Sequence, residues 1–467
     1  MKYHTYRQLF LGTLLVISAL LFTNCNKDKD PTPEEQTIEK IIAETPIDPY
    51  TIAKKLVDQA GWPEEVELDF ELGTIQLLNY KREVVKGDIV HYSFDLAVGT
   101  HQYDKIGVHR VVKETAANTP LKTSTALFFQ HGDLKNFTGM MLPSTFSPSM
   151  PEGFGLATYL AENDVDVWGI DQAWCAVPAG VTDFSFFKDF GLDKATRDLR
   201  NAMAVARIAR YLTGNGLDAL HMAGYSSGMS TVYAVADMET QMETGLRHAK
   251  TLIPIDMIIK SDQAFINELW DQQLALSQEP WDMGQYESYL GFTFLTGLAL
   301  SDPGGPSPVF EGFTNLQVML FYGCANIAGA ASPFHYWAAE WVNDFPSTPK
   351  YTTWEQIMDF TGSAIEYQPH KFWIDYNIML GNSHDSPYDD HLGQIKLPIY
   401  NVAAGGGFGN AATYGASLTG STDVTHKIVA LDTPENALYD FGHVDLFTAS
   451  NAPGLWWGEF LGWLEAH

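Results

Sequence analysis

The class of fold can be inferred from one continuous segment, ALHMAGYSSGMSTVYAVADM, which occupies residues 219–238. Its first seven residues are mostly apolar and predict a short buried strand, and its last thirteen have the pattern of a helix. Between them lies the pentapeptide GYSSG (residues 224–228), whose two glycines permit a tight turn from strand to helix. A buried strand that passes directly into a helix is typical of a parallel α/β sheet.

Apolar runs of strand length flank this segment on both sides. The two earliest alternate apolar with polar residues, and the later ones are almost wholly apolar, as expected of strands buried on both faces. We expect strands at residues 89–98, 106–114, 126–130, 165–171, 251–259, 397–405 and 426–431, and an amphipathic helix at residues 193–212. Strands alternating with helices predict an α/β fold with a mostly parallel sheet and helices on both faces.

The alternation stops over residues 257–396, which are rich in aromatic residues and mainly helical in pattern. An insertion between two core strands is placed to cap the carboxyl ends of the sheet, where open α/β sheets bind ligands. Its rings could instead only pack the core of the cap itself. The rest divides into a signal (1–24), a tether (25–46), a first core part (47–256) and a second core part (397–467).

The formal net charge of −29 excludes one class of partner. A surface this acidic repels phosphate backbones, so we expect no nucleic-acid binding. The chain has only three cysteines, too few for a disulfide framework, so the core must form by ordinary apolar burial. Cys175 and Cys324 could pair only if their Cα atoms approach within about 7 Å, which the sequence leaves open.

The amino terminus has the pattern of an export signal. Lys2 and Arg7 precede an apolar run of 15 residues (9–23), too short to cross a bilayer core of roughly 30 Å as a helix. Cys25 follows, and an apolar run that ends at a lone cysteine resembles a bacterial lipoprotein signal, which implies lipidation of Cys25. The charged residues 26–30 resemble the surface-export signal of Bacteroidetes lipoproteins. The alternative is a simple signal peptide cleaved nearby.

GYSSG also fits the pattern G-x-S-x-G of a nucleophile elbow, which would expose the hydroxyl of Ser226 at the end of its strand. A serine needs a base to accept its proton, and His443 stands out among the 14 histidines. It follows the last predicted strand and precedes the final helix, where the order Ser…acid…His expects the base. The alternatives are a purely structural turn at Ser226 and a capping or core histidine at His443.

Four segments together are similar to the acid lipase branch of the α/β-hydrolase superfamily: FFQHGDLKNF (128–137), LATYLAENDVDVWGIDQAW (156–174), GYSSG and FGHVDLFTASNAPGLWWGEFLGWL (441–464). The resemblance runs from about Ile106 to the carboxyl terminus, without the cap. It implies an α/β-hydrolase fold, hydrolysis of carboxylic esters, Ser226 as nucleophile and His443 as base. It also implies that the amides of Asp133 and Ser227 form an oxyanion hole, whereas the side chain of His131 is expected to be structural.

The chain departs from the family at the third member of the triad. The family places an aspartate directly after the strand that corresponds to residues 397–405, but this chain continues as GGGFGNAA (405–412). Asp256 is our substitute, because it ends the strand that follows the nucleophile helix, where some α/β-hydrolases carry their acid. Asp423 and Asp432 remain alternatives, and Asp256 could instead only cap a helix of the cap. Asp445 is expected to cap the last helix.

The sequence therefore predicts a lipid-anchored extracytoplasmic serine esterase or lipase on the outer membrane or cell surface, acting on a small-molecule ester without cofactor or metal. The alternatives are a non-catalytic binding protein on the same scaffold, a serine peptidase and an acyltransferase. An acidic loop at residues 384–391 contains two histidines and three aspartates. Its spacing matches no metal motif, and a solvated acidic loop is the simpler interpretation.

Overall fold

The computed structural model describes residues 31–58, 66–70, 73–325 and 334–467. The predicted signal, Cys25 and the export segment 26–30 lie outside these residues. The described part of the chain contains no helix long and apolar enough to cross a membrane. It is built on one large sheet in the order β1-β2-β3-β4-β7-β6-β8-β9-β14-β15, with the short β5 paired to β4.

The two halves of this sheet differ in direction. Strands β1 to β5 pair antiparallel with one another, and β4 also pairs antiparallel with β7. From β7 to β15 all neighbours are parallel. The strands are β1 (Val66–Phe70), β2 (Gly73–Lys86), β3 (Ile89–Ala97), β4 (Lys105–Ala116), β5 (Thr119–Pro120), β6 (Ala126–Gln130), β7 (Asp166–Asp171), β8 (Leu220–Tyr225), β9 (Ala249–Ile255), β14 (Ile399–Ala404) and β15 (Val424–Val429).

All seven strands predicted in the segments flanking residues 219–238 are present, and the prediction for β6 matches at both ends. Strand β9 ends at Ile255, four residues earlier than expected, because Asp256 turns the chain with a left-handed φ of 50°. Strands β1 and β2 were not predicted. The later part of β2 carries Lys81, Arg82, Glu83 and Lys86, so it lacks the apolar alternation that marks a strand.

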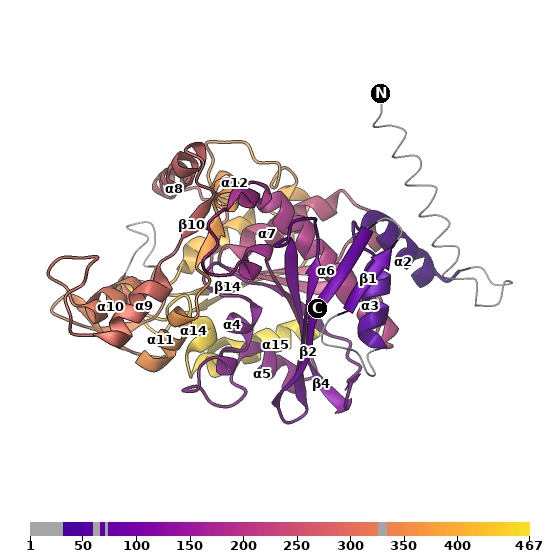
Figure 1. Ribbon diagram of the computed structural model, residues 1–467, viewed down its shortest axis with the longest axis horizontal. Helices are drawn as coiled ribbons and strands as arrows, with labels where there is room; N and C mark the ends of the chain where they lie inside the picture. The colour runs from indigo at the N-terminus through magenta and orange to yellow at the C-terminus, as the bar shows by residue number, and fades with distance from the viewer. Residues whose placement is uncertain (1–30, 59–65, 71–72, 326–333) are drawn as a thin grey trace.

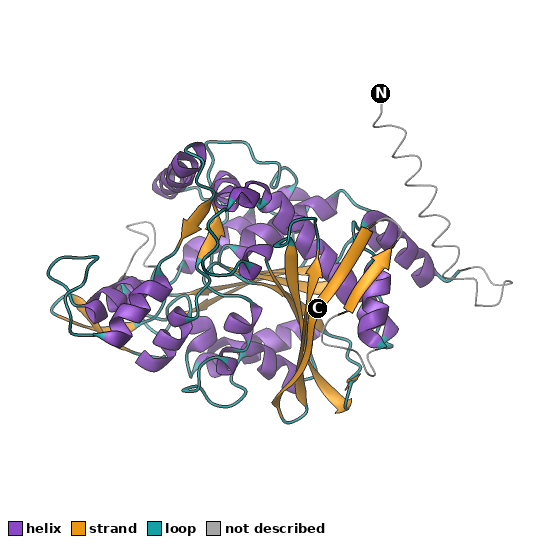
Figure 2. Ribbon diagram, viewed as in Figure 1, coloured by secondary structure: helices purple, strands orange, loops and turns teal. Residues whose placement is uncertain are grey.

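Helices cover both faces of the sheet (Figures 1 and 2). Alternate residues of one strand point to opposite faces, so Phe128 of β6 joins one apolar core while Leu127 and Phe129 join the other. The predicted α/β class, with helices on both faces, is confirmed. The helices are α2 (Pro33–Glu44), α3 (Pro49–Val57), α4 (Phe137–Met141), α5 (Leu156–Glu162), α6 (Leu192–Leu212), α7 (Gly228–Thr240), α8 (Ala264–Asp282), α9 (Phe292–Ser301), α10 (Asn315–Cys324), α11 (Trp354–Gly362), α12 (His370–Leu380), α13 (Tyr414–Ser417), α14 (Asp445–Thr448) and α15 (Gly458–Ala466).

Between β9 and β14 the chain leaves the sheet and builds a largely helical insertion from α8 to α12, called the cap below. It also contains two small antiparallel sheets, β10 (Glu287–Tyr289) with β13 (Tyr367–Pro369) and β11 (Ala339–Val342) with β12 (Phe345–Pro349). In Figure 1 the cap extends from α8 and α12 at the top to α9 and α10 at the far left.

Part of the segment predicted as a tether is folded. Residues 33–44 form α2, whose Ile38 and Ile41 are buried in the core. A capping box joins Thr32 and Glu35 at the start of this helix, and Pro33 occupies its first turn. The prolines and acidic residues that suggested a flexible tether are therefore helix-starting signals here. The tether prediction is wrong for these twelve residues.

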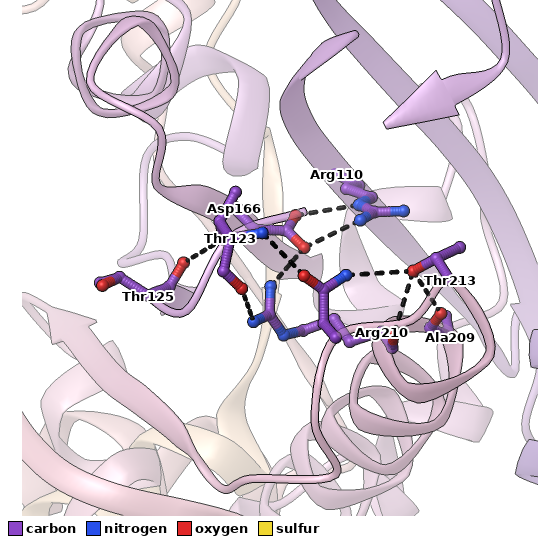
Figure 3. A network of polar contacts seen from close by, with 8 residues as sticks. Arg110, Thr123, Thr125, Asp166, Ala209, Arg210 and Thr213 are labelled. Atoms are coloured by element: carbon purple, nitrogen blue, oxygen red, sulfur yellow. Dashed lines mark hydrogen bonds and ion pairs between the residues drawn. The ribbon is translucent and has the colours of Figure 1, made fainter. Parts of the chain in front are cut away.

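A buried ion network joins the two halves of the sheet to helix α6 (Figure 3). Arg110 of β4 donates two hydrogen bonds to the carboxylate of Asp166 on β7, at 2.9 and 2.8 Å, and Arg210 of α6 donates a third at 2.6 Å. All three side chains are buried. Burial opposes ionisation of Asp166, yet the two guanidinium groups hold the pKa of its carboxyl below the ordinary value.

We expect Asp166→Asn to destabilise the protein by about 3–5 kcal/mol, because it leaves two buried guanidinium groups without their counter-charge. Since the folded-state pKa of Asp166 is lowered, its contribution is present at neutral pH and is lost as the pH falls below about 4. Urea denaturation at pH 7 measures the loss. The control is Asp164→Asn, two residues away, because the ion pair of Asp164 with Lys113 is at the surface. Equal stability of the two variants would contradict the prediction.

Candidate active site

Ser226 occupies the turn between β8 and α7 with a left-handed φ of 53°, rare for a residue other than glycine. Its amide donates to the carbonyl of Ile255 at 3.0 Å, which ties the turn to the neighbouring strand β9. Backbone strain of this kind persists only where the surroundings enforce it. The turn therefore has the geometry of a nucleophile elbow, with Ser226 at its tip.

Three glycines make room for this turn. A Cβ at Gly224 would lie 2.6 Å from the carbonyl oxygen of Gly228, and one at Gly132 would lie 2.6 Å from the Cβ of Ser226. A Cβ at Gly228 would overlap the carbonyl oxygen of His131. Gly224 is thus required by close approach of the end of β8 to the start of α7, whereas Gly228 and Gly132 are required by close approach of the elbow to the loop after β6.

His443 lies beside Asp256, with 2.7 Å between its Nδ1 and the Oδ2 of Asp256. The histidine is 2% exposed and the aspartate is fully buried. The two other candidate acids lie elsewhere: Asp423 contacts His467, and Asp432 accepts a hydrogen bond from Asn436. Of the three carboxylates proposed from sequence, the structure brings Asp256 to the histidine.

The glycine-rich loop after β14 explains how this acid is accommodated. Its backbone amides at Ala404 and Phe408 donate to the Oδ1 of Asp256 at 3.1 and 3.0 Å, which leaves Oδ2 for His443. A Cβ at Gly407 would overlap the Asp256 carboxylate. The loop has no acid of its own at residues 405–407 and instead encloses the carboxylate of Asp256, which directly follows β9. Its Gly407 gives that carboxylate space.

The ring of His443 is enclosed by aromatic side chains. It stacks on Tyr225 with 4.5 Å between ring centroids, and Phe334 and Phe408 lie 5.0 and 5.9 Å away. The hydroxyl of Tyr225 also donates to the backbone carbonyl of His443 at 3.2 Å. These contacts restrict the rotation of the imidazole, so its hydrogen bond with Asp256 is held in one orientation.

The amides of Asp133 and Ser227 belong to the residues that directly follow Gly132 and Ser226, and a Cβ at Gly132 would lie 2.6 Å from the Cβ of Ser226. Across residues 31–58, 66–70, 73–325 and 334–467, neither N–H has a hydrogen-bond acceptor. Unpaired amides in sites this sheltered are rare, and they are available to a developing oxyanion. The Ser227 hydroxyl also donates to the Asp133 carboxylate, while burial raises the pKa of Asp133 to about 6.

His131 is not among the residues that line the cavity beside Ser226, and its side chain supports the loop after β6. Its Nε2 accepts the amide N–H of Gln172 at 3.0 Å, so Nδ1 carries the proton and donates to the carbonyl of Gly132 at 2.6 Å. Burial lowers the pKa of the imidazole, which favours this neutral form. These contacts agree with the structural role expected for His131.

A cavity of about 230 Å³ adjoins Ser226 and His443, between the carboxyl ends of the strands and the cap. Its walls are mostly aromatic and aliphatic, and α8 and α12 supply one side. Burial lowers the pKa of Lys135 in this lining to about 7. The lining residues are Gly132, Asp133, Leu134, Lys135, Met140, Tyr225, Ser226, Met257, Ile258, Leu269, Trp270, Gln273, Phe334, Tyr336, Phe360, Trp373, Tyr376, Asn377, Phe408, His443 and Val444.

The prediction that Asp445 caps the last helix is wrong, because Asp445 is the first residue of the short α14, whose N-cap is Val444, and the last helix is α15. The fully buried carboxylate of Asp445 instead holds the loop that carries His443. It accepts hydrogen bonds from the amides of Gly442 and Ala338 at 2.9 and 2.8 Å, and from the hydroxyl of Thr352 at 2.8 Å. Ala338 and Thr352 belong to the cap. Asp445 thus joins the histidine loop to the cap.

The remaining candidates from the sequence lie apart from this site. In the acidic loop, Asp389 pairs with Lys260 and His391 with Asp237, and the described residues contain no group of three acidic, histidine or cysteine residues placed to hold a metal. Cys175 and Cys324 are not paired with each other. Cys25 lies outside the described residues.

The residues of the cap that reach the site were not predicted from the sequence. They include Phe334 and Tyr336, which line the cavity near His443, and Trp270 and Trp373, which form the wall from α8 and α12. Aromatic enrichment marked the cap as a whole but singled out no residue. The run of glycines at residues 405–407 was a usable signal, since it showed that this loop lacks the acid.

Neither protein-family models nor curated protein sequences match this chain. Solved structures do match its fold. A candidate lipase from Sulfolobus solfataricus is 14% identical and aligns over 83% of this chain and 99% of its own, with a TM-score of 0.54. An esterase from Thermogutta terrifontis (12% identical, 80% and 97% covered) and a monoglyceride lipase variant from Saccharomyces cerevisiae (13%, 83% and 94%) give TM-scores of 0.42 and 0.39. The first of these likenesses, together with the mostly parallel sheet covered by helices, shows that the chain has the α/β-hydrolase fold.

Proposed function

We propose that this protein is a serine hydrolase that cleaves carboxylic esters, an esterase or lipase acting through Ser226, His443 and Asp256. The α/β-hydrolase fold hosts many activities, so the proposal depends on the site. The observation that carries it is the geometry around one cavity: a serine on a strained elbow, a histidine bonded to a buried carboxylate, and two amides without acceptors.

The chemistry follows from these positions. His443 accepts the proton of Ser226 as its oxygen attacks the ester carbonyl, and Asp256 stabilises the imidazolium through Nδ1. The amides of Asp133 and Ser227 donate to the tetrahedral oxyanion. His443 then protonates the departing alcohol, which leaves the acyl group on Ser226. In the second half of the reaction His443 accepts a proton from a water molecule as that water attacks the acyl carbonyl. It then donates the proton to the oxygen of Ser226, which releases the carboxylic acid and restores the serine.

The cavity favours small substrates. Its volume of about 230 Å³ is below the roughly 300–1,000 Å³ typical of small-molecule pockets, and its lining is mostly apolar. These features support an ester with a short apolar acyl chain. 4-Nitrophenyl butyrate is therefore the substrate chosen for the experiments below.

We further propose that the protein is exported and anchored by a lipid on Cys25, at the outer membrane or cell surface. The apolar run that ends at this cysteine supports the anchor, and the following charged residues support surface export. Globomycin, which blocks lipoprotein signal cleavage, should cause the unprocessed chain to accumulate. Normal processing in its presence would contradict the anchor.

We expect a fluorophosphonate probe to label the folded protein at Ser226, because the probe phosphonylates serines that are activated by a neighbouring base. Mass spectrometry of the labelled peptide identifies the site. Heat-denatured protein is the control, since unfolding separates Ser226 from His443. Absence of labelling in the folded protein would favour a binding protein on a hydrolase scaffold and would overturn the proposed function.

A further inference from the structure

The oxyanion loop after β6 is attached to the cap along three consecutive residues. The side-chain amide of Gln368 donates to the carbonyl of Asp133 at 2.7 Å, and the amide of Ile365 donates to the carbonyl of Leu134 at 2.9 Å. The ammonium of Lys135 reaches the hydroxyl of Ser363. The cap segment 363–368 therefore runs along residues 133–135, and its attachment begins at Asp133, whose N–H has no acceptor among the described residues.

Asp133 is held on both sides. The preceding peptide unit contains the carbonyl of Gly132, which accepts the Nδ1 proton of His131, and the N–H of Asp133 itself. The following unit contains the carbonyl that accepts from Gln368. Because a peptide unit is planar, the hydrogen bond from His131 to the Gly132 carbonyl orients the Asp133 N–H in the same unit. The hydrogen bond from Gln368 to the Asp133 carbonyl anchors the next unit, and the two anchors together limit rotation about the φ and ψ of Asp133. His131 belongs to the core of the fold, whereas Gln368 belongs to the cap.

Gln368 makes this contact at a cost to its own hydrogen bonding. It is 1% exposed on β13, and within the described residues its Oε1 has no hydrogen-bond donor. A buried amide oxygen without a partner is unfavourable by about 1–3 kcal/mol, so an apolar residue would suit the packing better. A buried polar group in this situation calls for an explanation.

We infer that Gln368 is a positioning residue for ester hydrolysis, which aims the Asp133 amide at the oxyanion through its hydrogen bond with the Asp133 carbonyl. The inference rests on the proposed function. Through this one residue of β13, the cap contributes to the geometry of the oxyanion hole.

The test replaces Gln368 with leucine, which keeps the approximate volume and removes the donor. We expect the kcat for 4-nitrophenyl butyrate to fall on the order of 10-fold with little change in KM, since the oxyanion exists only during reaction. The affinity for an alkylboronic acid, whose tetrahedral adduct with Ser226 imitates that state, should fall by a similar factor. A purely structural role for Gln368 would lower stability without this parallel loss.

The matched control is Thr361→Val. Thr361 is buried in the cap and accepts a hydrogen bond from Thr296 at 2.7 Å, so this variant also loses a buried hydrogen bond of the cap but leaves residues 133–135 untouched. Its kcat and boronic acid affinity should stay near those of the wild type. If the Gln368→Leu variant has the same kcat and the same affinity for the boronic acid as the wild type, the inference is wrong. If Ser226→Ala retains full activity, the proposed function itself fails instead.

Discussion

Ser226→Ala is expected to reduce the hydrolysis of 4-nitrophenyl butyrate by about 10⁴- to 10⁶-fold, to the residual rate that the oxyanion hole and substrate binding still support. The hydroxyl is the atom that attacks, and no neighbouring group can replace it at the tip of the elbow. Alanine also keeps the Cβ, so the left-handed φ of 53° becomes no more strained than in the wild type. Initial rates measured beside a thermal unfolding curve separate loss of chemistry from loss of fold.

Ser230→Ala is the matched control for this experiment. Ser230 lies in the first turn of α7, and its hydroxyl donates to the carbonyl of Ser227 at 2.7 Å. Both variants therefore remove one hydroxyl near the same turn, but only Ser226 lines the cavity. We expect Ser230→Ala to keep most of the activity. Full activity of the Ser226 variant would disprove the proposed mechanism.

Asp256→Asn is expected to lower kcat on the order of 10⁴-fold. Asparagine retains an Oδ1 that can accept from the amides of Ala404 and Phe408, so the glycine-rich loop should keep its shape. Its Nδ2 would then face Nδ1 of His443 as a donor, which favours the wrong tautomer of the imidazole and withdraws the charge that stabilises the imidazolium. The pH dependence of kcat, measured with the same ester, reports the change at the histidine.

Asp423→Asn and Asp432→Asn provide the comparison. Both carboxylates lie at the surface, where they contact His467 and Asn436 respectively, and neither lines the cavity. We expect each variant to retain nearly full activity. If either loses more activity than Asp256→Asn, another carboxylate must orient the base and our choice of acid is wrong.

Local patterns were sufficient for the framework of the fold. The segment 219–238 predicted a strand, a tight turn and a helix, and the structure contains β8, the elbow and α7 in that order. These elements are readable because apolar periodicity and glycine placement act over a few neighbouring residues. Local patterns gave a wrong prediction at residues 33–44. The proline and acidic residues there suggested a flexible tether, but the segment is a helix whose Ile38 and Ile41 pack onto the core.

The acid of the site could be proposed from the sequence but not distinguished from its rivals. Asp256 and His443 are 187 residues apart, and three aspartates were compatible with the order of strands. The choice depends on how β9 and β14 lie side by side, because that pairing brings the amides of Ala404 and Phe408 to Asp256. The absence of an acid at residues 405–407 is explained only by this contact, in which the loop encloses the carboxylate of Asp256.

By itself, the sequence determined the α/β framework, the elbow at Ser226 and the position of His443 after the last strand, because each follows from residues adjacent along the chain. The tertiary structure decided which carboxylate meets His443, which side chains line the cavity and how β13 reaches the oxyanion loop. Those relations depend on packing between segments more than a hundred residues apart, such as Gln368 and Asp133. A contact between residues so far apart in the chain produces no periodic pattern in the sequence from which it could be predicted.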